Sequence, residues 1–221
     1  MANMEDRHTL AVRFFHWWDA VSILALIFSG FYIHNPYGFF RWMFYDLDTA
    51  RKVHFIFMYC IIAGLVGRLY YAFATDDWKN FAMGPKDMAN MLKLMLYYLF
   101  ITNEEPDWGG KYNPGQKGMY AAFAPLLLIQ IYTGMIMMWP GTFSSWALWL
   151  GGIKWIREVH YIVAWVFVYC VAAHLYLDFS EGWDNILGMF TGKRPVKVHH
   201  RHKSPLVHRE ATQGEATQGL D

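Results

Sequence analysis

The chain has 221 residues, of which 55% are apolar, 19% aromatic and 17% charged, and its formal net charge is +1. An ordinary soluble domain carries about 25% charged residues, so this chain has too few to cover a water-facing surface of its size. The composition excludes a disordered chain, a disulfide-stapled secreted domain and a nucleic-acid binder, and two cysteines are too few for an iron–sulfur cluster. We interpret the chain as a polytopic membrane protein.

Four segments are long and apolar enough to cross a bilayer, which takes about 20 mostly apolar residues. They are 14–33, 53–74, 119–139 and 159–179. The shorter stretch Lys86–Ile101 mixes apolar and polar residues and predicts an amphipathic helix at the interface. Residues 146–153 predict a second, shorter interfacial piece. The expected fold class is therefore an all-α integral membrane protein, a four-helix transmembrane bundle with an amphipathic interfacial helix between spans two and three.

The distribution of positive charge orients the bundle. Four spans put both termini on one side, and that side carries 14 of the 19 lysines and arginines. Cytoplasmic loops hold the excess of positive charge, so we expect both termini in the cytoplasm of a bacterial inner membrane. Residues 1–192 then form one four-span domain, and 193–221 form a polar, mobile tail. Four tail histidines allow a metal-binding tract, but a basic segment near anionic headgroups is the favoured interpretation.

Four of the ten histidines occupy matched positions in the spans. His160 and His174 are 14 residues apart in span four, just under four turns, so they leave the same face about 21 Å apart along the axis. His16 lies at the start of span one and His54 at the start of span two. Because successive spans run in opposite directions, depth pairs His54 with His160 near the outer leaflet and His16 with His174 near the inner one.

Two imidazoles at each of two depths are the ligand set of two stacked b-type haems, each iron being held axially on both sides. With both axial positions filled, such a site transfers electrons and leaves no open position for oxygen or a substrate. A single intramembrane histidine is often a structural hydrogen-bonding residue. Polar side chains in a bilayer are nevertheless costly, and four at matched depths are difficult to obtain by chance. The sequence therefore predicts two haem b groups.

An arginine precedes three of these histidines by three residues. The three are Arg13, Arg51 and Arg157. On a helix this spacing puts the arginine on the face of its histidine, one turn nearer the membrane surface, where a guanidinium suits a haem propionate. Snorkelling of an arginine at a helix end explains the same position equally well, so both interpretations stay open.

Several short motifs carry a family resemblance. They are Val-Arg-Phe-Phe-His-Trp-Trp at 12–18, Gly-Phe-Tyr-Ile-His-Asn-Pro at 30–36, Arg-Lys-Val-His-Phe at 51–55, Gly-Arg-Leu-Tyr-Tyr-Ala-Phe at 67–73, Tyr-Tyr-Leu-Phe at 97–100, and His160 followed by His174-Leu-Tyr. Through them the chain, from about residue 12 to 179, resembles the b-type cytochrome subunit of membrane-bound nickel–iron hydrogenases, whose superfamily includes the cytochrome subunit of formate dehydrogenase. Arg157 stands where hydrogenase cytochromes often have another histidine.

The resemblance implies a function and partners. A nickel–iron large subunit and an iron–sulfur small subunit oxidise H2 at the outer face, and this subunit anchors them and conducts the electrons. The acceptor is a quinone, menaquinone or ubiquinone, bound beside the inner haem, and the chain itself has no hydrogen-activating site. Polar residues placed to serve the quinone are Asn113, Gln116, Asp178 and Asp19. For each of these four, a solvated loop or helix-end position is the alternative.

Two other functions remain open. The first keeps both haems and replaces the hydrogenase with a formate dehydrogenase or another periplasmic oxidoreductase, because the haem sites do not encode the partner. The second is a structural membrane anchor whose histidines pack without a cofactor.

Overall fold

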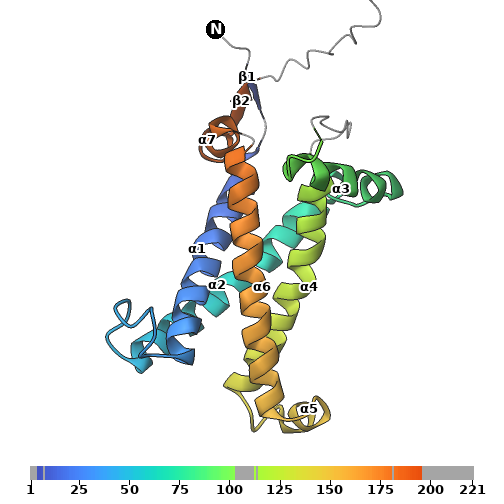
Figure 1. Ribbon diagram of the computed structural model, residues 1–221. Helices are drawn as coiled ribbons and strands as arrows, with labels where there is room; N and C mark the ends of the chain where they lie inside the picture. The colour runs from blue at the N-terminus through green and yellow to red at the C-terminus, as the bar shows by residue number, and fades with distance from the viewer. Residues whose placement is uncertain (1–3, 7, 103–111, 113, 181, 196–221) are drawn as a thin grey trace, which may run out of the picture.

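Four long helices dominate the computed structural model, which describes residues 4–6, 8–102, 112, 114–180 and 182–195 (Figure 1). They are α1 (Leu10–His34), α2 (Leu47–Ala74), α4 (Pro114–Met138) and α6 (Ile153–Ser180). Each is long and apolar enough to cross a membrane. The four helices coincide with the four predicted spans, so the expected fold class is confirmed.

Each long helix begins four to six residues before the predicted span, and side-chain caps mark the starts of α1 and α2. The Thr9 side chain accepts a hydrogen bond from the Val12 backbone N–H at 3.4 Å, and Asp46 accepts one from Thr49 at 2.6 Å. Such caps satisfy backbone donors that the first turn leaves free. Pro114, at the first position of α4, has the backbone angle that a helix start requires. Because these residues mark the helix starts through hydrogen bonds and backbone angle, hydropathy does not locate them.

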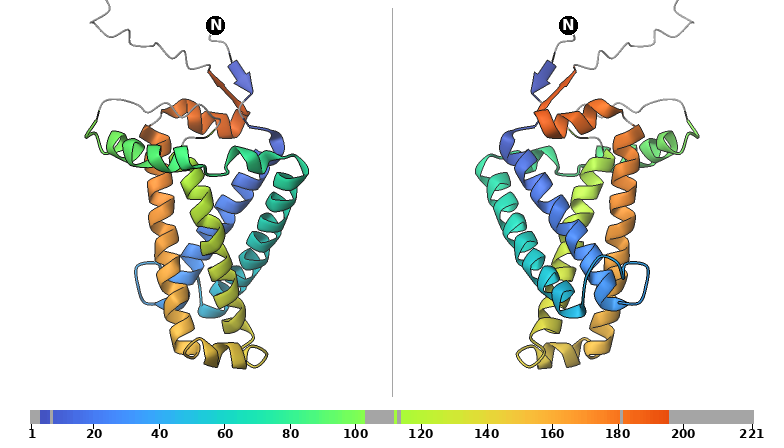
Figure 2. Two further views of the ribbon diagram at one scale, coloured as in Figure 1. Left: turned by 90° about the vertical axis from the view of Figure 1, so that its right-hand side faces the viewer. Right: turned by 90° about the vertical axis from the view of Figure 1, so that its left-hand side faces the viewer.

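Three short α-helices cover the two ends of the bundle, and a short 3-10 helix, η1 (Asp77–Asn80), follows α2 (Figures 1 and 2). The helix α3 (Pro85–Tyr98) lies across the end at which α2 stops and α4 starts, and it confirms the predicted interfacial helix. At the opposite end α5 (Ser144–Trp149) joins α4 to α6, where a second interfacial piece was expected. The sequence did not predict α7 (Trp183–Thr191), which lies on the same end as α3.

A two-stranded ribbon joins the two ends of the described chain. The strands β1 (Met4–Asp6) and β2 (Lys193–Pro195) pair antiparallel, with Asp6 opposite Lys193. Gly192 adopts the left-handed conformation (φ 82°) that allows the chain to turn from α7 into β2. The predicted polar tail therefore begins with a strand, and its remaining residues, 196–221, lie outside the described part of the chain.

The long helices pack as two pairs, α1 along α2 and α4 along α6. A glycine allows α1 and α2 to pack closely, because a Cβ on Gly67 would lie only 2.7 Å from Cε1 of Phe15. Between the two pairs close backbone approaches are few, and contact is made through rings such as Phe31 and Trp165, whose centroids are 4.8 Å apart. Side chains rather than backbones therefore meet along the middle of the bundle.

Candidate functional site

Two pairs of histidine rings meet between the helix pairs. His54 of α2 and His160 of α6 have ring centroids 6.4 Å apart. His16 of α1 and His174 of α6 have centroids 6.1 Å apart. The pairs lie near opposite ends of α6, because the 14 residues between its two histidines span about 21 Å of helix. These are the two pairs that depth and spacing predict.

The separation of the rings suits one iron ion between each pair. An imidazole nitrogen binds a transition metal at about 2.0 Å, and the ring centroid lies about 1.1 Å behind that nitrogen, so two imidazoles on opposite sides of one metal have centroids about 6.2 Å apart. Both observed separations lie close to this value. Among the described residues no group of three or more His, Cys, Asp or Glu side chains gathers to hold a bare metal ion. Two protein ligands per site suit a metal whose other ligands belong to a macrocycle.

A hydroxyl group from a neighbouring helix contacts each ring of the His54–His160 pair. Ser29 Oγ on α1 lies 2.9 Å from His54 Nδ1, and Thr133 Oγ1 on α4 lies 2.8 Å from His160 Nδ1. Both hydroxyl residues are buried. The sequence analysis did not identify Ser29 and Thr133. The one sequence feature that they share is that each precedes a glycine within an apolar span.

The helix α4 does more than close the bundle. The Gln130 side chain donates a hydrogen bond to the backbone carbonyl of His160 at 3.1 Å, one turn from the Thr133 contact. A helix without any histidine therefore holds both the backbone and the ring of a histidine on α6. All four long helices contribute to the His54–His160 level.

The surroundings of the second pair are charged instead. His174 Nε2 lies 3.3 Å from a carboxylate oxygen of Asp178, one turn further along α6. His16 Nδ1 and one carboxylate oxygen of Asp19 are buried, and neither has a hydrogen-bond partner among the described residues. Asp19 also interacts electrostatically with Arg68, whose Nη2 lies 2.7 Å from Asp77 Oδ2. Carboxylates therefore lie beside the histidines at this level, whereas hydroxyl groups contact the rings at the other.

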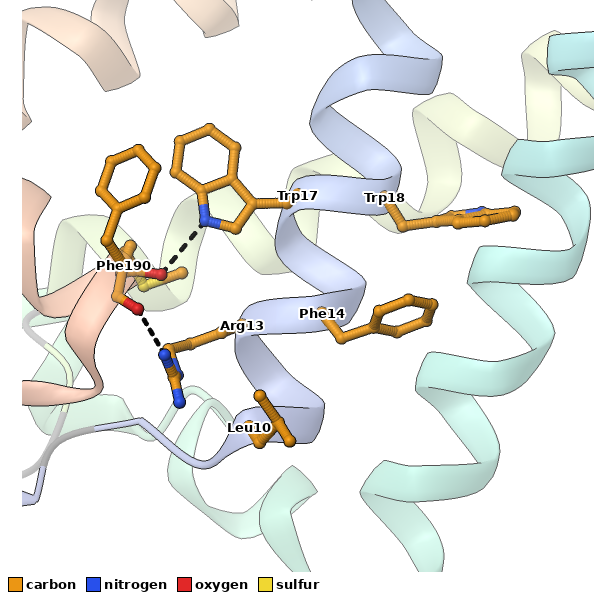
Figure 3. Close-up of a pocket in the computed structure, with 7 residues that line it drawn as sticks. Leu10, Arg13, Phe14, Trp17, Trp18 and Phe190 are labelled. Atoms are coloured by element: carbon orange, nitrogen blue, oxygen red, sulfur yellow. Dashed lines mark hydrogen bonds between the residues drawn. The ribbon is translucent and has the colours of Figure 1, made fainter.

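The three arginines differ in their surroundings. Arg13 Nη1 donates a hydrogen bond to the Phe190 carbonyl in the last turn of α7, and Trp17 Nε1 donates one to the Met189 carbonyl at 3.1 Å (Figure 3). Arg13 Nε is buried without a hydrogen-bond partner among the described residues. Arg51 and Arg157 are exposed on their helices. Arg13 therefore fixes α7 against α1, a role that the sequence did not suggest.

The residues expected near a quinone are only partly brought together. Asp178 and Asp19 lie at the His16–His174 level, as described above. Gln116 is half-buried in the first turn of α4. Tyr120, one turn further along, interacts electrostatically with Asp178, which places the start of α4 near this level. Asn113 lies outside the described residues.

The model of a protein family described as prokaryotic cytochrome b561 matches residues 7–192. The probable Ni/Fe-hydrogenase B-type cytochrome subunit of Cupriavidus necator is 24% identical over 208 residues, which cover 84% of this chain and 85% of that protein. The protein of the same name from Azotobacter vinelandii is 24% identical over 187 residues, with 77% and 78% covered. The formate dehydrogenase, nitrate-inducible, cytochrome b556(Fdn) subunit of Escherichia coli is 22% identical over 204 residues, with 75% and 90% covered.

Proposed function

The chain belongs to the prokaryotic cytochrome b561 family of membrane cytochromes, and from this premise we propose that it holds two haem b groups and carries electrons across the membrane to quinone. The observation that carries the proposal is the pair of ring separations, 6.4 and 6.1 Å, each suited to one iron between two imidazoles. Haem iron held in this way alternates between its ferric and ferrous states, which is one-electron chemistry.

The protein contributes ligation and rigidity. His54 and His160 would hold one haem, and His16 and His174 the other. Each pair draws its two rings from different helices, and the close packing within α1–α2 and α4–α6 keeps those helices fixed. With both histidines of a pair as its ligands, a bound haem would have no position left for a small substrate. Electron transfer is the chemistry that such sites support.

Arginines would complete the sites at the ends of the helices. We propose Arg13, Arg51 and Arg157 as partners of haem propionates, because each lies one turn from its histidine. The buried Arg13 Nε, which has no hydrogen-bond partner among the described residues, supports this for Arg13. The exposure of Arg51 and Arg157 is equally suited to snorkelling.

The proposed partner is a nickel–iron hydrogenase, with its large subunit and its iron–sulfur small subunit on the outer face. This choice is supported by the relatives from Cupriavidus necator and Azotobacter vinelandii, which are named as probable subunits of a Ni/Fe-hydrogenase. The excess of positive charge at the end that carries both termini favours a bacterial inner membrane with both termini in the cytoplasm. A formate dehydrogenase is the second candidate partner, because the match to the formate dehydrogenase subunit of Escherichia coli covers 90% of that protein.

Quinone reduction is proposed at the His16–His174 level. Reduction of a quinone consumes protons as well as electrons, and at this level two carboxylates, those of Asp178 and Asp19, lie beside the histidines. Gln116 and Asn113 are amides suited to hold a quinone carbonyl. Either menaquinone or ubiquinone satisfies this chemistry.

Haem content tests the proposal directly. The reduced-minus-oxidised spectrum of the purified complex should show b-type absorption, with two haems per copy of this chain. His54→Ala and His160→Ala should each remove one haem, and His16→Ala and His174→Ala the other. The matched control is His34→Ala, because His34 lies in the same helix as His16 but stacks on Tyr161, with centroids 4.0 Å apart.

Three results are informative. Loss of the same haem in His16→Ala and His54→Ala would refute the pairing. Absence of b-type absorption would favour a structural anchor without cofactor. The dehydrogenase that co-purifies with the chain would separate the hydrogenase from the formate dehydrogenase.

A further inference from the structure

Two similar arrangements hold the two rings of the His54–His160 pair. On α1, Ser29 contacts Nδ1 of His54, and the next residue is Gly30, where a Cβ would lie 3.3 Å from His54 Cε1. On α4, Thr133 contacts Nδ1 of His160, and a Cβ on Gly134 would lie 3.5 Å from His160 Cε1. In both cases a hydroxyl residue followed by glycine, on one helix, holds a histidine of the helix packed against it.

The direction of these hydrogen bonds follows from the backbone. Ser29 Oγ lies 2.6 Å from the Ala25 carbonyl, and Thr133 Oγ1 lies 2.6 Å from the Ile129 carbonyl. A carbonyl only accepts, so the single hydroxyl proton of each residue is donated to its own helix. The hydroxyl oxygen therefore accepts from the ring, which requires a proton on Nδ1. The lone pair of each neutral imidazole is then on Nε2, the atom left free to bind a metal.

We propose that Ser29-Gly30 and Thr133-Gly134 are two imidazole clamps, which fix the tautomer and rotation of His54 and His160 and set the reduction potential of the haem between them. The proposal rests on the haem ligation proposed above. The clamp residues are positioning residues, because they act on the iron through the histidines. In metal sites the hydrogen bond on the remote ring nitrogen commonly orients the ligand and raises its basicity.

The expected effect on the potential has a definite sign. A bond from Nδ1–H to a hydroxyl oxygen makes Nε2 a stronger donor, which stabilises ferric iron more than ferrous iron. The hydroxyl dipoles also stabilise the extra positive charge of the ferric site in an apolar setting. Removing either hydroxyl therefore raises the potential of this haem. The other haem should not respond, because among the described residues no hydroxyl contact of this kind reaches His16, and His174 faces Asp178.

The test uses matched variants in the complete complex. Thr133→Val removes the hydroxyl with little change of shape, whereas Thr133→Ser keeps it. Ser29→Ala is compared with Ser22→Ala, because Ser22 is similarly buried on α1 and donates to the Trp18 carbonyl at 2.8 Å, and it makes no hydrogen bond to a histidine among the described residues. Redox titration of the b-type absorption gives both potentials, and the low-spin ferric EPR signals report ring orientation at each haem.

If the clamps act as proposed, Thr133→Val and Ser29→Ala each raise the reduction potential of the haem between His54 and His160 and alter its ferric EPR signal. Thr133→Ser and Ser22→Ala should behave like wild type. Loss of that haem alone in Thr133→Val, with retention in Thr133→Ser, also supports it. Wild-type potentials in both hydroxyl-free variants would overturn the clamp while leaving haem ligation intact. Equal shifts in Ser22→Ala, or shifts of both haems together, would overturn it as well. Absence of haem from the wild-type complex would instead refute the proposed function.

Discussion

Substitution of Gly64 by alanine tests whether the close approach of α1 and α2 is essential to the bundle. Gly64 lies within α2, and a Cβ there would overlap a carboxylate oxygen of Asp19 and lie 2.9 Å from Cδ1 of Trp18. The indole has little freedom to move, because Trp18 Nε1 donates a hydrogen bond to the Cys60 carbonyl at 2.8 Å. The added methyl group must therefore separate the helices or break this bond.

The expected change in the free energy of unfolding of Gly64→Ala results from two opposing effects. Overpacking of this kind costs about 1–3 kcal/mol. Replacing glycine by alanine inside a helix stabilises the folded protein by about 0.5–1 kcal/mol, because alanine loses less backbone entropy on folding. We expect a net loss of about 1–2 kcal/mol, which corresponds to a thermal midpoint lowered by roughly 2–8 °C for a chain of this size.

The matched control is Gly118→Ala on α4, where a Cβ would lie 2.7 Å from Met91 Cε. That methyl group ends a flexible side chain and can move away, so this variant should equal or exceed wild type in stability. Thermal unfolding in one detergent, followed by tryptophan fluorescence, compares the three proteins. A midpoint for Gly64→Ala at or above that of wild type would refute the reasoning.

Two further predictions concern ionisable groups outside and at the end of the bundle. Asp87 caps α3 by accepting a hydrogen bond from the Gly84 backbone N–H, and it contacts Lys117 at 3.0 Å. These two interactions lower the pKa of Asp87. Asp87→Asn should therefore lower the free energy of unfolding by about 1 kcal/mol at pH 7. The stabilisation is present above the unfolded pKa of about 3.9 and is lost as pH falls through the lower folded pKa, so thermal midpoints of the variant and wild type should converge in acid. Asp178→Asn should slow quinone reduction several-fold while both haems and H2-driven dye reduction remain, because asparagine keeps an acceptor near His174; unchanged quinone rates would place the quinone elsewhere.

Hydropathy and spacing predict the architecture because both depend on local sequence. A run of about 20 apolar residues has few alternatives to a membrane span. The 14-residue interval between His160 and His174 fixes their depth difference on any straight helix. The start of each helix is less predictable, because residues such as Thr9 and Asp46 contribute through hydrogen bonds rather than apolar character.

Contacts between distant segments are what the sequence does not reveal. The position of α7 depends on hydrogen bonds from Arg13 and Trp17, more than 170 residues away along the chain. Ser29 and Thr133 are ordinary residues in apolar helices, where a hydroxyl satisfies itself on its own backbone. Their contacts with histidine arise only because α1 packs on α2 and α4 on α6. The sequence pattern predicts the positions of the four histidines, whereas the residues that hold the His54 and His160 rings follow only from the packing of the helices.

The side chains around the two histidine pairs differ, and the difference favours one direction of electron flow. At the His54–His160 level the contacts to the rings are neutral hydroxyls, which orient imidazoles without exchanging protons. At the His16–His174 level carboxylates are present, and Asp19 lies near the Arg68–Asp77 ion pair at the end of α2. Electron transfer alone needs no proton carrier, whereas quinone reduction does. On the proposed function, electrons therefore enter at the level where hydroxyls contact the rings, and the reaction with quinone belongs to the level where carboxylates lie beside the histidines.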